Sequence, residues 1–128
     1  MAKQVLVTPG VYQAKGYSQA IKVGNTLYLA GIVGMDEKGN INKTDSGAQA
    51  KQIWANIEKI LKHQGGTLQD IVEITTYITR KEDHIAVRDA RRAAWTRDPQ
   101  PTATLVVCSA LASPDLLVEI NGTAVLDK

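Results

Sequence analysis

The chemistry-bearing side chains of this sequence concentrate near its C-terminal end. Glu119, Asn121 and Thr123 alternate along the segment 117–126, so a strand there would place all three on one face. A carboxylate can act as a general base, whereas an amide can hold a water molecule but cannot take its proton in the ordinary pH range. Glu119 is therefore the candidate base of this face. The alternative is an ion pair between Glu119 and a neighbouring strand or helix.

A second group of polar side chains is basic. Arg88, Arg91 and Arg92 lie on one side of a predicted helix, and Asp89 can pair with Arg92 at a spacing of three residues. A guanidinium group can hold a carboxylate through two parallel hydrogen bonds, which a lysine cannot match. The same pattern is also typical of a solvated basic helix face, and both interpretations stay open.

Thiol and metal chemistry are poorly supported. The chain of 128 residues has one cysteine and two histidines, without C-x-x-C or H-x-x-x-H spacing. Cys108 is expected to be a buried strand residue, and His63 and His84 are not expected to be catalytic. We therefore predict no metal site. The net charge of +2, with Lys and Arg spread along the chain and not interleaved with aromatic residues, also argues against nucleic-acid binding.

The elements that must position these residues follow from the apolar pattern. The period of residues 45–64 predicts a helix with an apolar stripe ending at Gly65 and Gly66, and a second helix should begin after Asp83. Strands are expected at 4–8, 17–23, 26–33, 71–79, 102–108 and 117–126. This order predicts an α+β fold with one six-stranded mixed sheet and two helices on one face.

In three of these strands, apolar residues occupy both the odd and the even positions. Alternate positions point to opposite faces of a sheet, so both faces should be buried. Two helices can cover only one face, and we therefore expect a homo-oligomer. Nothing in the sequence marks a domain boundary, so residues 1–128 are read as a single domain. No segment is apolar enough for a membrane span and the N-terminus does not resemble a signal peptide, so the expected location is the cytoplasm and no membrane partner is expected.

The sequence resembles the RidA/YjgF family of reactive imine and enamine deaminases. The matching pieces are spread over nearly the whole chain: residues 16–20 (GYSQA), Gly24-Asn25, 29–31 (LAG), Gln49, Asn56, 70–72 (DIV), Thr75, 101–104 (PTAT) and 117–120 (LVEI). The resemblance implies a chorismate-mutase-like fold and a homotrimer, with sheets around a central barrel and clefts between subunits. It also implies hydrolysis of a small imine or enamine that carries a carboxylate, without a cofactor.

The departures from the family pattern concern the cleft itself. The deaminases carry an Arg where this chain has Ala103, and by the resemblance Asn121 takes the place of the family's Glu. Arg88 stands at a third cleft position, where the deaminases often have Asn. It could restore the anion clamp from the opposite wall of the cleft, which would be lined by Ala103, Thr104 and Leu105.

The remaining family cleft positions are Tyr17 and Gly31, which could also simply shape the fold. The first hypothesis is an enzyme in which Arg88 orients the substrate and either Glu119 or a water held by Asn121 attacks. The alternative is a trimer that binds a small metabolite without turnover, as a sensor, carrier or chaperone-like surface. RNA binding or cleavage, which the label of some family members suggests, has no support in the residues.

Overall fold

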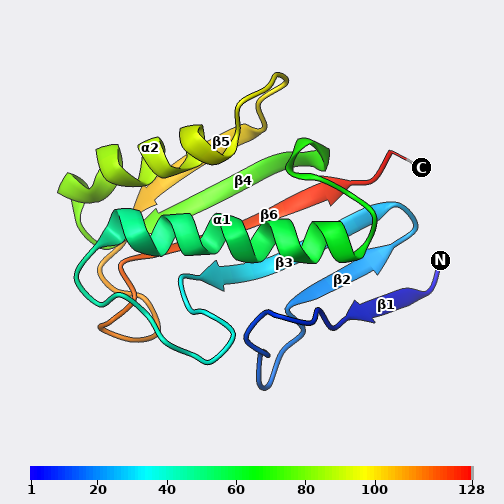
Figure 1. Cartoon of the computed structure of the whole chain (residues 1–128), viewed down its shortest axis with the longest axis horizontal. Coiled ribbons are helices and arrows are strands. Elements are labelled where there is room, and N and C mark those ends of the chain that lie inside the picture. The colour runs from blue at the N-terminus through cyan, green and yellow to red at the C-terminus, as the bar shows by residue number, and fades with distance from the viewer. Residues whose placement is uncertain (128) are drawn as a thin grey trace.

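One mixed sheet forms the framework of the molecule (Figure 1). The computed structural model describes residues 1–127. Its strand order is β1-β2-β3-β6-β4-β5, and every neighbouring pair is antiparallel except β4 and β5, which are parallel. The strands are β1 (Lys3–Leu6), β2 (Ala20–Val23), β3 (Thr26–Val33), β4 (Ile71–Ile78), β5 (Thr102–Val107) and β6 (Val118–Val125).

Two helices cover one face of this sheet (Figure 1). They are α1 (Ser46–His63) and α2 (His84–Ala94), and short 3-10 turns η1 (Leu68–Asp70) and η2 (Lys81–Asp83) precede β4 and α2. The Asp45 carboxylate caps α1 by accepting a hydrogen bond of 2.9 Å from the Ala48 backbone N–H. The α+β class and the six-stranded sheet with two helices are thus confirmed.

The core lies between the helices and the sheet because the apolar stripe of α1 faces the strands. Each residue of the predicted stripe is at most 2% exposed: Ala50, Ile53, Trp54, Ile57, Ile60 and Leu61. Trp54 also packs edge to face against Trp95, with ring centroids 5.9 Å apart, which joins α1 to the end of α2. Trp54 is therefore a core residue.

The other face of the sheet, called here the open face, is not covered within the described residues. Tyr28 and Val125 point to it and are 53% and 44% exposed. Strand β5 is an edge strand whose six residues are all exposed. Monomeric proteins rarely leave such apolar sheet surface bare, which agrees with the expected oligomer. The homotrimer itself stays a prediction.

The second helix begins directly after Asp83, as predicted. The Asp83 carboxylate binds the Arg80 guanidinium at 2.8 and 3.0 Å and caps no backbone N–H of α2. One local prediction needs correction. Asp89 contacts Arg88 at 3.2 Å, where the spacing had suggested Arg92. Neither described helix has the length and apolar content needed to cross a bilayer.

Candidate functional site

The first candidate site is a cavity of about 560 Å³ beside Glu119, called here the Glu119 cavity. Tyr17 and Gly31, two of the predicted cleft residues, line it together with Glu119. The chain before β2, the end of β3 with the residues after it, α1 and the loop before β6 supply the rest of the lining. It is mainly apolar: Val11, Tyr12, Ala14, Lys15, Gln19, Ala30, Val33, Met35, Asn56, Ala112, Ser113 and Leu116. One carboxylate therefore lies in a largely apolar hollow.

Gly31 makes room for the Glu119 side chain. The pairing of β3 with β6 shifts between Leu29 and Ile32, so Gly31 lies within an irregularity of the strand. A Cβ atom at Gly31 would collide with Glu119 Oε2 and would lie 2.6 Å from its Cδ. The absence of a side chain at Gly31 thus lets the carboxylate lie across β3.

Burial raises the pKa of the Glu119 carboxyl above its ordinary value of 4.5. A half-buried carboxyl loses part of its hydration, and the loss penalises the charged form. Within residues 1–127 no ion pair joins Glu119 to a basic side chain, so the predicted alternative of a structural ion pair is not found there. A carboxyl with a raised pKa and no ionic partner is suited to exchange protons with a ligand.

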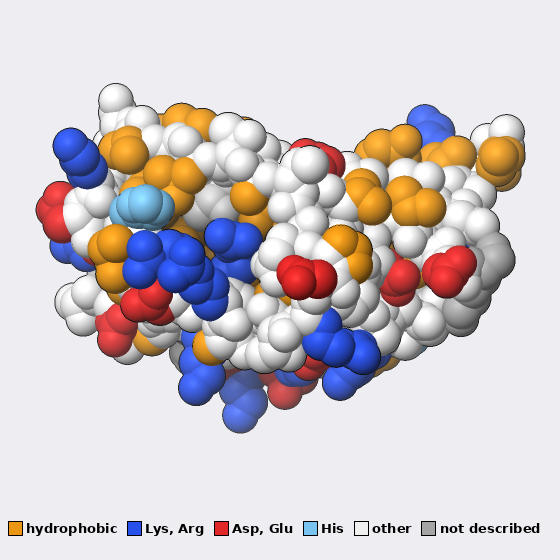
Figure 2. Space-filling view, turned by 90° about the horizontal axis from the view of Figure 1, so that it is seen from above, with side chains coloured by type: hydrophobic (Ala, Val, Ile, Leu, Met, Phe, Trp, Pro, Cys, Tyr) orange, Lys and Arg blue, Asp and Glu red, His pale blue; other side chains and the backbone are white. Residues whose placement is uncertain are grey.

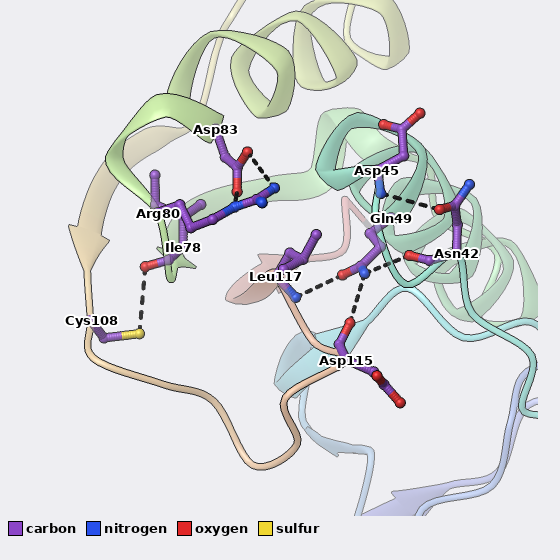
Figure 3. Close-up of polar contacts among 9 residues, drawn as sticks. All are labelled: Asn42, Asp45, Gln49, Ile78, Arg80, Asp83, Cys108, Asp115 and Leu117. Carbon is purple, nitrogen blue, oxygen red and sulfur yellow. Dashed lines mark hydrogen bonds and ion pairs between the residues drawn. The ribbon is translucent and has the colours of Figure 1, made fainter.

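The buried amide of Gln49 holds the chain just before β6, the strand that carries Glu119; Figure 3 shows the contacts of Gln49. Its Nε2 donates to the carbonyl oxygens of Asn42 at 2.7 Å and Asp115 at 2.9 Å. Its Oε1 accepts a hydrogen bond of 2.9 Å from the Leu117 backbone N–H. A single side chain on α1 therefore joins two loops and the residue that precedes β6.

Asn56, about two turns of α1 after Gln49, lines the Glu119 cavity. Its Nδ2 donates to the carbonyl oxygens of Val33 at 3.2 Å and Met35 at 2.8 Å, while Gln52 donates to its Oδ1 at 2.8 Å. These bonds hold the chain as it leaves β3. Gln49 and Asn56 were among the residues that match the family, but the sequence did not show that they hold the loops around the Glu119 cavity.

A second candidate site is a cavity of about 190 Å³ between α2 and the β4–β5 edge of the sheet, called here the α2–β5 recess. The structure brings four predicted site residues together here: Arg88, Ala103, Thr104 and Leu105. Ile74, Thr76, Val87 and Ile120 complete its floor, and His84 and Arg91 add two basic groups. The recess therefore joins a basic helix face to a small apolar strand surface.

The two sites lie on opposite faces of the sheet. Glu119 lines the first cavity and its neighbour Ile120 lines the second, as expected because successive side chains of a strand point to opposite faces. Within one chain the carboxylate and the arginines therefore do not face a common ligand. Asn121 lies on the open face opposite Thr75 and lines neither cavity. Its proposed role with water stays a prediction.

The remaining chemistry-bearing residues are not part of either site. The Cys108 thiol is partly buried just after β5 and lies 3.6 Å from the Ile78 carbonyl oxygen (Figure 3). His63 ends α1. In the part of the chain that the structure describes, no three His, Cys, Asp or Glu side chains are grouped so that they could hold a metal ion.

His84 and Arg91 were not among the predicted site residues. Together with Arg88 they occupy positions i, i+4 and i+7 of α2, a spacing that places three side chains on one helix face. That spacing was a usable signal. The contribution of Lys15 and Tyr12 to the Glu119 cavity had no such signal, because irregular loops bring them there.

Comparison with known proteins decides the family. The family model described as endoribonuclease L-PSP matches residues 9–126. The chain belongs to this family. Its members include proteins named RidA and YjgF, so the resemblance noted in the sequence is confirmed.

Similar L-PSP family proteins match this chain along almost their whole length. A RutC family protein of Pyrococcus abyssi is 35% identical over 126 residues, which is 97% of this chain and 98% of that protein. A 2-iminobutanoate/2-iminopropanoate deaminase of Dermatophagoides farinae is 30% identical over 127 residues, 98% of each chain. The crystal structure of RidA from a Psychrobacter species superposes with a TM-score of 0.89 at 32% identity, covering 96% of this chain and 99% of that one.

Proposed function

We propose that this protein hydrolyses the imine or enamine of a small carboxylic acid in a cleft between two copies of the chain, within a homotrimer. The observation that carries the proposal is the Glu119 carboxyl, half-buried beside Gly31 and Tyr17, with a raised pKa and no ionic partner in residues 1–127. The name of the Dermatophagoides farinae relative supports this reaction class.

The need for two copies follows from the separation of the two cavities. Glu119 and the arginine-lined recess lie on opposite faces of one sheet, yet the recess opens beside β5 at the sheet edge. A second chain whose open face approaches that edge would bring its own Glu119 cavity to the α2–β5 recess. Burial of the bare apolar residues on the open face would stabilise this assembly.

The reaction needs only a base, an acid and an anion clamp. Arg88 would hold the substrate carboxylate. Ionised Glu119 would take a proton from water as the water oxygen bonds to the imine carbon. Protonated Glu119 would return that proton to the nitrogen, which gives a carbinolamine. Glu119 would then carry the hydroxyl proton of the carbinolamine to the nitrogen as the C–N bond breaks, so that imine and water yield a 2-oxo acid and ammonia. A raised pKa suits this exchange because the group must act both as base and as acid.

The test uses imines generated in place by an amino-acid oxidase, with ammonia release and semicarbazide trapping as readouts. We expect the purified protein to accelerate decay of 2-iminopropanoate. Glu119→Gln should lower kcat/KM by about 10²–10⁴-fold, the range typical of a lost general base. Glu73→Gln is the matched control, because Glu73 accepts a bond of 2.7 Å from Thr123 outside both cavities and the amide oxygen can still accept it.

The competing function is binding without turnover. The observation in its favour is Ala103, which brings no charge to the recess where the deaminases of the family carry Arg. Under that function, small carboxylates would raise the melting temperature and be recovered unchanged, and no imine would decay faster than in buffer. That combination of results would refute the proposed hydrolysis.

A further inference from the structure

The α2–β5 recess is strongly basic. Its lining includes the Arg88 and Arg91 guanidinium groups and the His84 imidazole, and contains no Asp or Glu. In Figure 2, Lys and Arg side chains gather beside a histidine next to a hollow bordered by hydrophobic side chains. Two guanidinium groups beside an apolar floor attract anions, because like charges held close together repel one another and a bound anion relieves that repulsion.

The cations of the recess are only partly neutralised by their neighbours. Arg88 contacts the exposed Asp89 carboxylate at 3.2 and 3.4 Å. Arg91 makes no ion pair within residues 1–127. Asp83, at the start of α2, is already held by Arg80 at 2.8 Å. Within residues 1–127, at least one guanidinium group of the recess is therefore left without a charged partner.

The spacing of these groups favours more than one anionic group. Along a helix the rise is about 1.5 Å per residue, so the backbone positions of His84, Arg88 and Arg91 are separated by roughly 6 Å and 4.5 Å on one face. A single carboxylate uses the two parallel donors of one guanidinium group. The second guanidinium and the imidazole would remain available for a second acidic group on the same molecule.

The opposite wall leaves space for such a molecule. Ala103 and Leu105 face α2 from β5, since they pair with Ile74 and Thr76 of β4, whose side chains are buried on the helix side. The small side chain of Ala103 leaves room in the recess and brings no charge to it. Selectivity for charge must therefore come from α2.

We propose that the α2–β5 recess selects a doubly anionic ligand, a 2-oxo acid or its imine that carries a second carboxylate or a phosphate. This inference rests on the proposed function for the class of compound, and it goes further by assigning Arg91 as the residue that recognises the second acidic group. The ligand carboxylate next to the reacting carbon binds Arg88, and the second group binds Arg91 with His84 at its side.

The first experiment measures binding without turnover. Isothermal titration compares 2-oxoglutarate, 2-oxopentanoate, which has the same five-carbon chain and a single carboxylate, and 3-phosphohydroxypyruvate. We expect at least one doubly anionic acid to bind about tenfold or more tightly than 2-oxopentanoate, as for a lost charge-assisted hydrogen bond. Which of the two binds more tightly identifies the second group as carboxylate or phosphate.

Two variants of α2 separate recognition from general charge. Arg91→Gln should abolish the preference for the doubly anionic acid while changing 2-oxopentanoate affinity by less than about threefold. Arg92→Gln removes the same charge from an exposed position outside the recess and should keep the preference. The proposal is overturned if the singly and doubly charged acids bind equally, if none binds, if the preference survives in Arg91→Gln, or if Arg92→Gln removes it equally.

Turnover distinguishes this inference from the proposed function. Imines generated from glutamate and from norvaline form a pair of equal chain length. If neither imine is hydrolysed but 2-oxoglutarate is still preferred, the hydrolytic function fails and the recess keeps its selectivity. If both imines are hydrolysed at equal kcat/KM and the two 2-oxo acids bind equally, the hydrolytic function stands and the inference about Arg91 fails.

Discussion

Adding one methyl group at Gly31 should displace the Glu119 carboxyl group, and so lower activity, while Glu119 itself is unchanged. In Gly31→Ala the new Cβ would lie 2.6 Å from Glu119 Cδ and 3.0 Å from its Cγ. Carbon atoms in ordinary contact are about 3.5–4.0 Å apart, so the carboxyl group must retreat by about 1 Å. A misplacement of that size can reduce a rate by about hundredfold. We expect kcat/KM for imine hydrolysis to fall by that factor.

A double-mutant cycle shows whether the loss acts through Glu119. If Gly31 matters only because it makes room for the carboxyl group, Glu119→Gln should cost little more in the Gly31→Ala background, so the two effects are far from additive. The displaced carboxyl should also be better hydrated, which lowers its pKa towards the ordinary value. Carbon NMR titration of labelled glutamate side chains measures that shift even in the absence of turnover.

The control adds the same methyl group far from Glu119. In Gly47→Ala, on the first turn of α1, the nearest atoms to the new Cβ are Asp45 Oδ1 at 3.3 Å and Ala86 Cβ at 3.5 Å, close to ordinary contacts. We expect unchanged kcat/KM and an unchanged Glu119 pKa. An active Gly31→Ala variant with the native Glu119 pKa would refute the reasoning, because the carboxyl group would then not depend on the space above Gly31.

Three further predictions concern Glu119, Gln49 and the β5 edge. The Glu119 pKa is raised in the folded state, so ionisation of Glu119 lowers the free energy of unfolding as pH rises from the ordinary pKa of 4.5 through the raised pKa. Urea titrations should therefore show Glu119→Gln more stable than the native chain at neutral pH and equally stable where Glu119 is protonated. Gln49→Leu leaves a backbone N–H and two carbonyl groups without their partner, so the free energy of unfolding should fall by about 2–4 kcal/mol, against about 1 kcal/mol for Gln52→Ala on the same helix. Val106→Lys on β5 should shift the mass measured by light scattering from trimer to monomer while circular dichroism stays native; an unchanged trimer would show that this strand is not at an interface.

The elements with strong periodicity were predictable because their signal is local. The strand 26–33 matches β3 in both bounds, and the expected helix 45–64 differs from α1 by one residue at each end. The ionic contacts of Asp83 and Asp89 around α2 were not predictable. The Asp83 carboxylate, for example, can reach both the start of α2 and the Arg80 guanidinium, and only the packing of the folded chain decides which of them it binds. Spacing alone ranks such alternatives poorly.

The candidate site was predictable in its residues but not in its arrangement. Tyr17, Gly31 and Glu119 do line one cavity, and Arg88 does lie with Ala103 to Leu105. That these form two groups on opposite faces depends on the parity of β6 relative to its neighbours and on the shifted pairing near Gly31. Such a shift involves residues far apart in the sequence, and nothing local encodes it.

The exposed edge of strand β5 makes the newly synthesised chain prone to aggregation. Its six residues, TATLVV, contain no charge and no proline, and four of them are β-branched. One long edge of the strand has no partner strand among the residues that the structure describes. Strands with these properties pair readily with strands of other molecules and begin aggregation. Until β5 is covered, a dilute or unassembled chain is prone to aggregate. The yield of soluble protein should therefore depend on how soon newly made chains associate with other copies of the same chain.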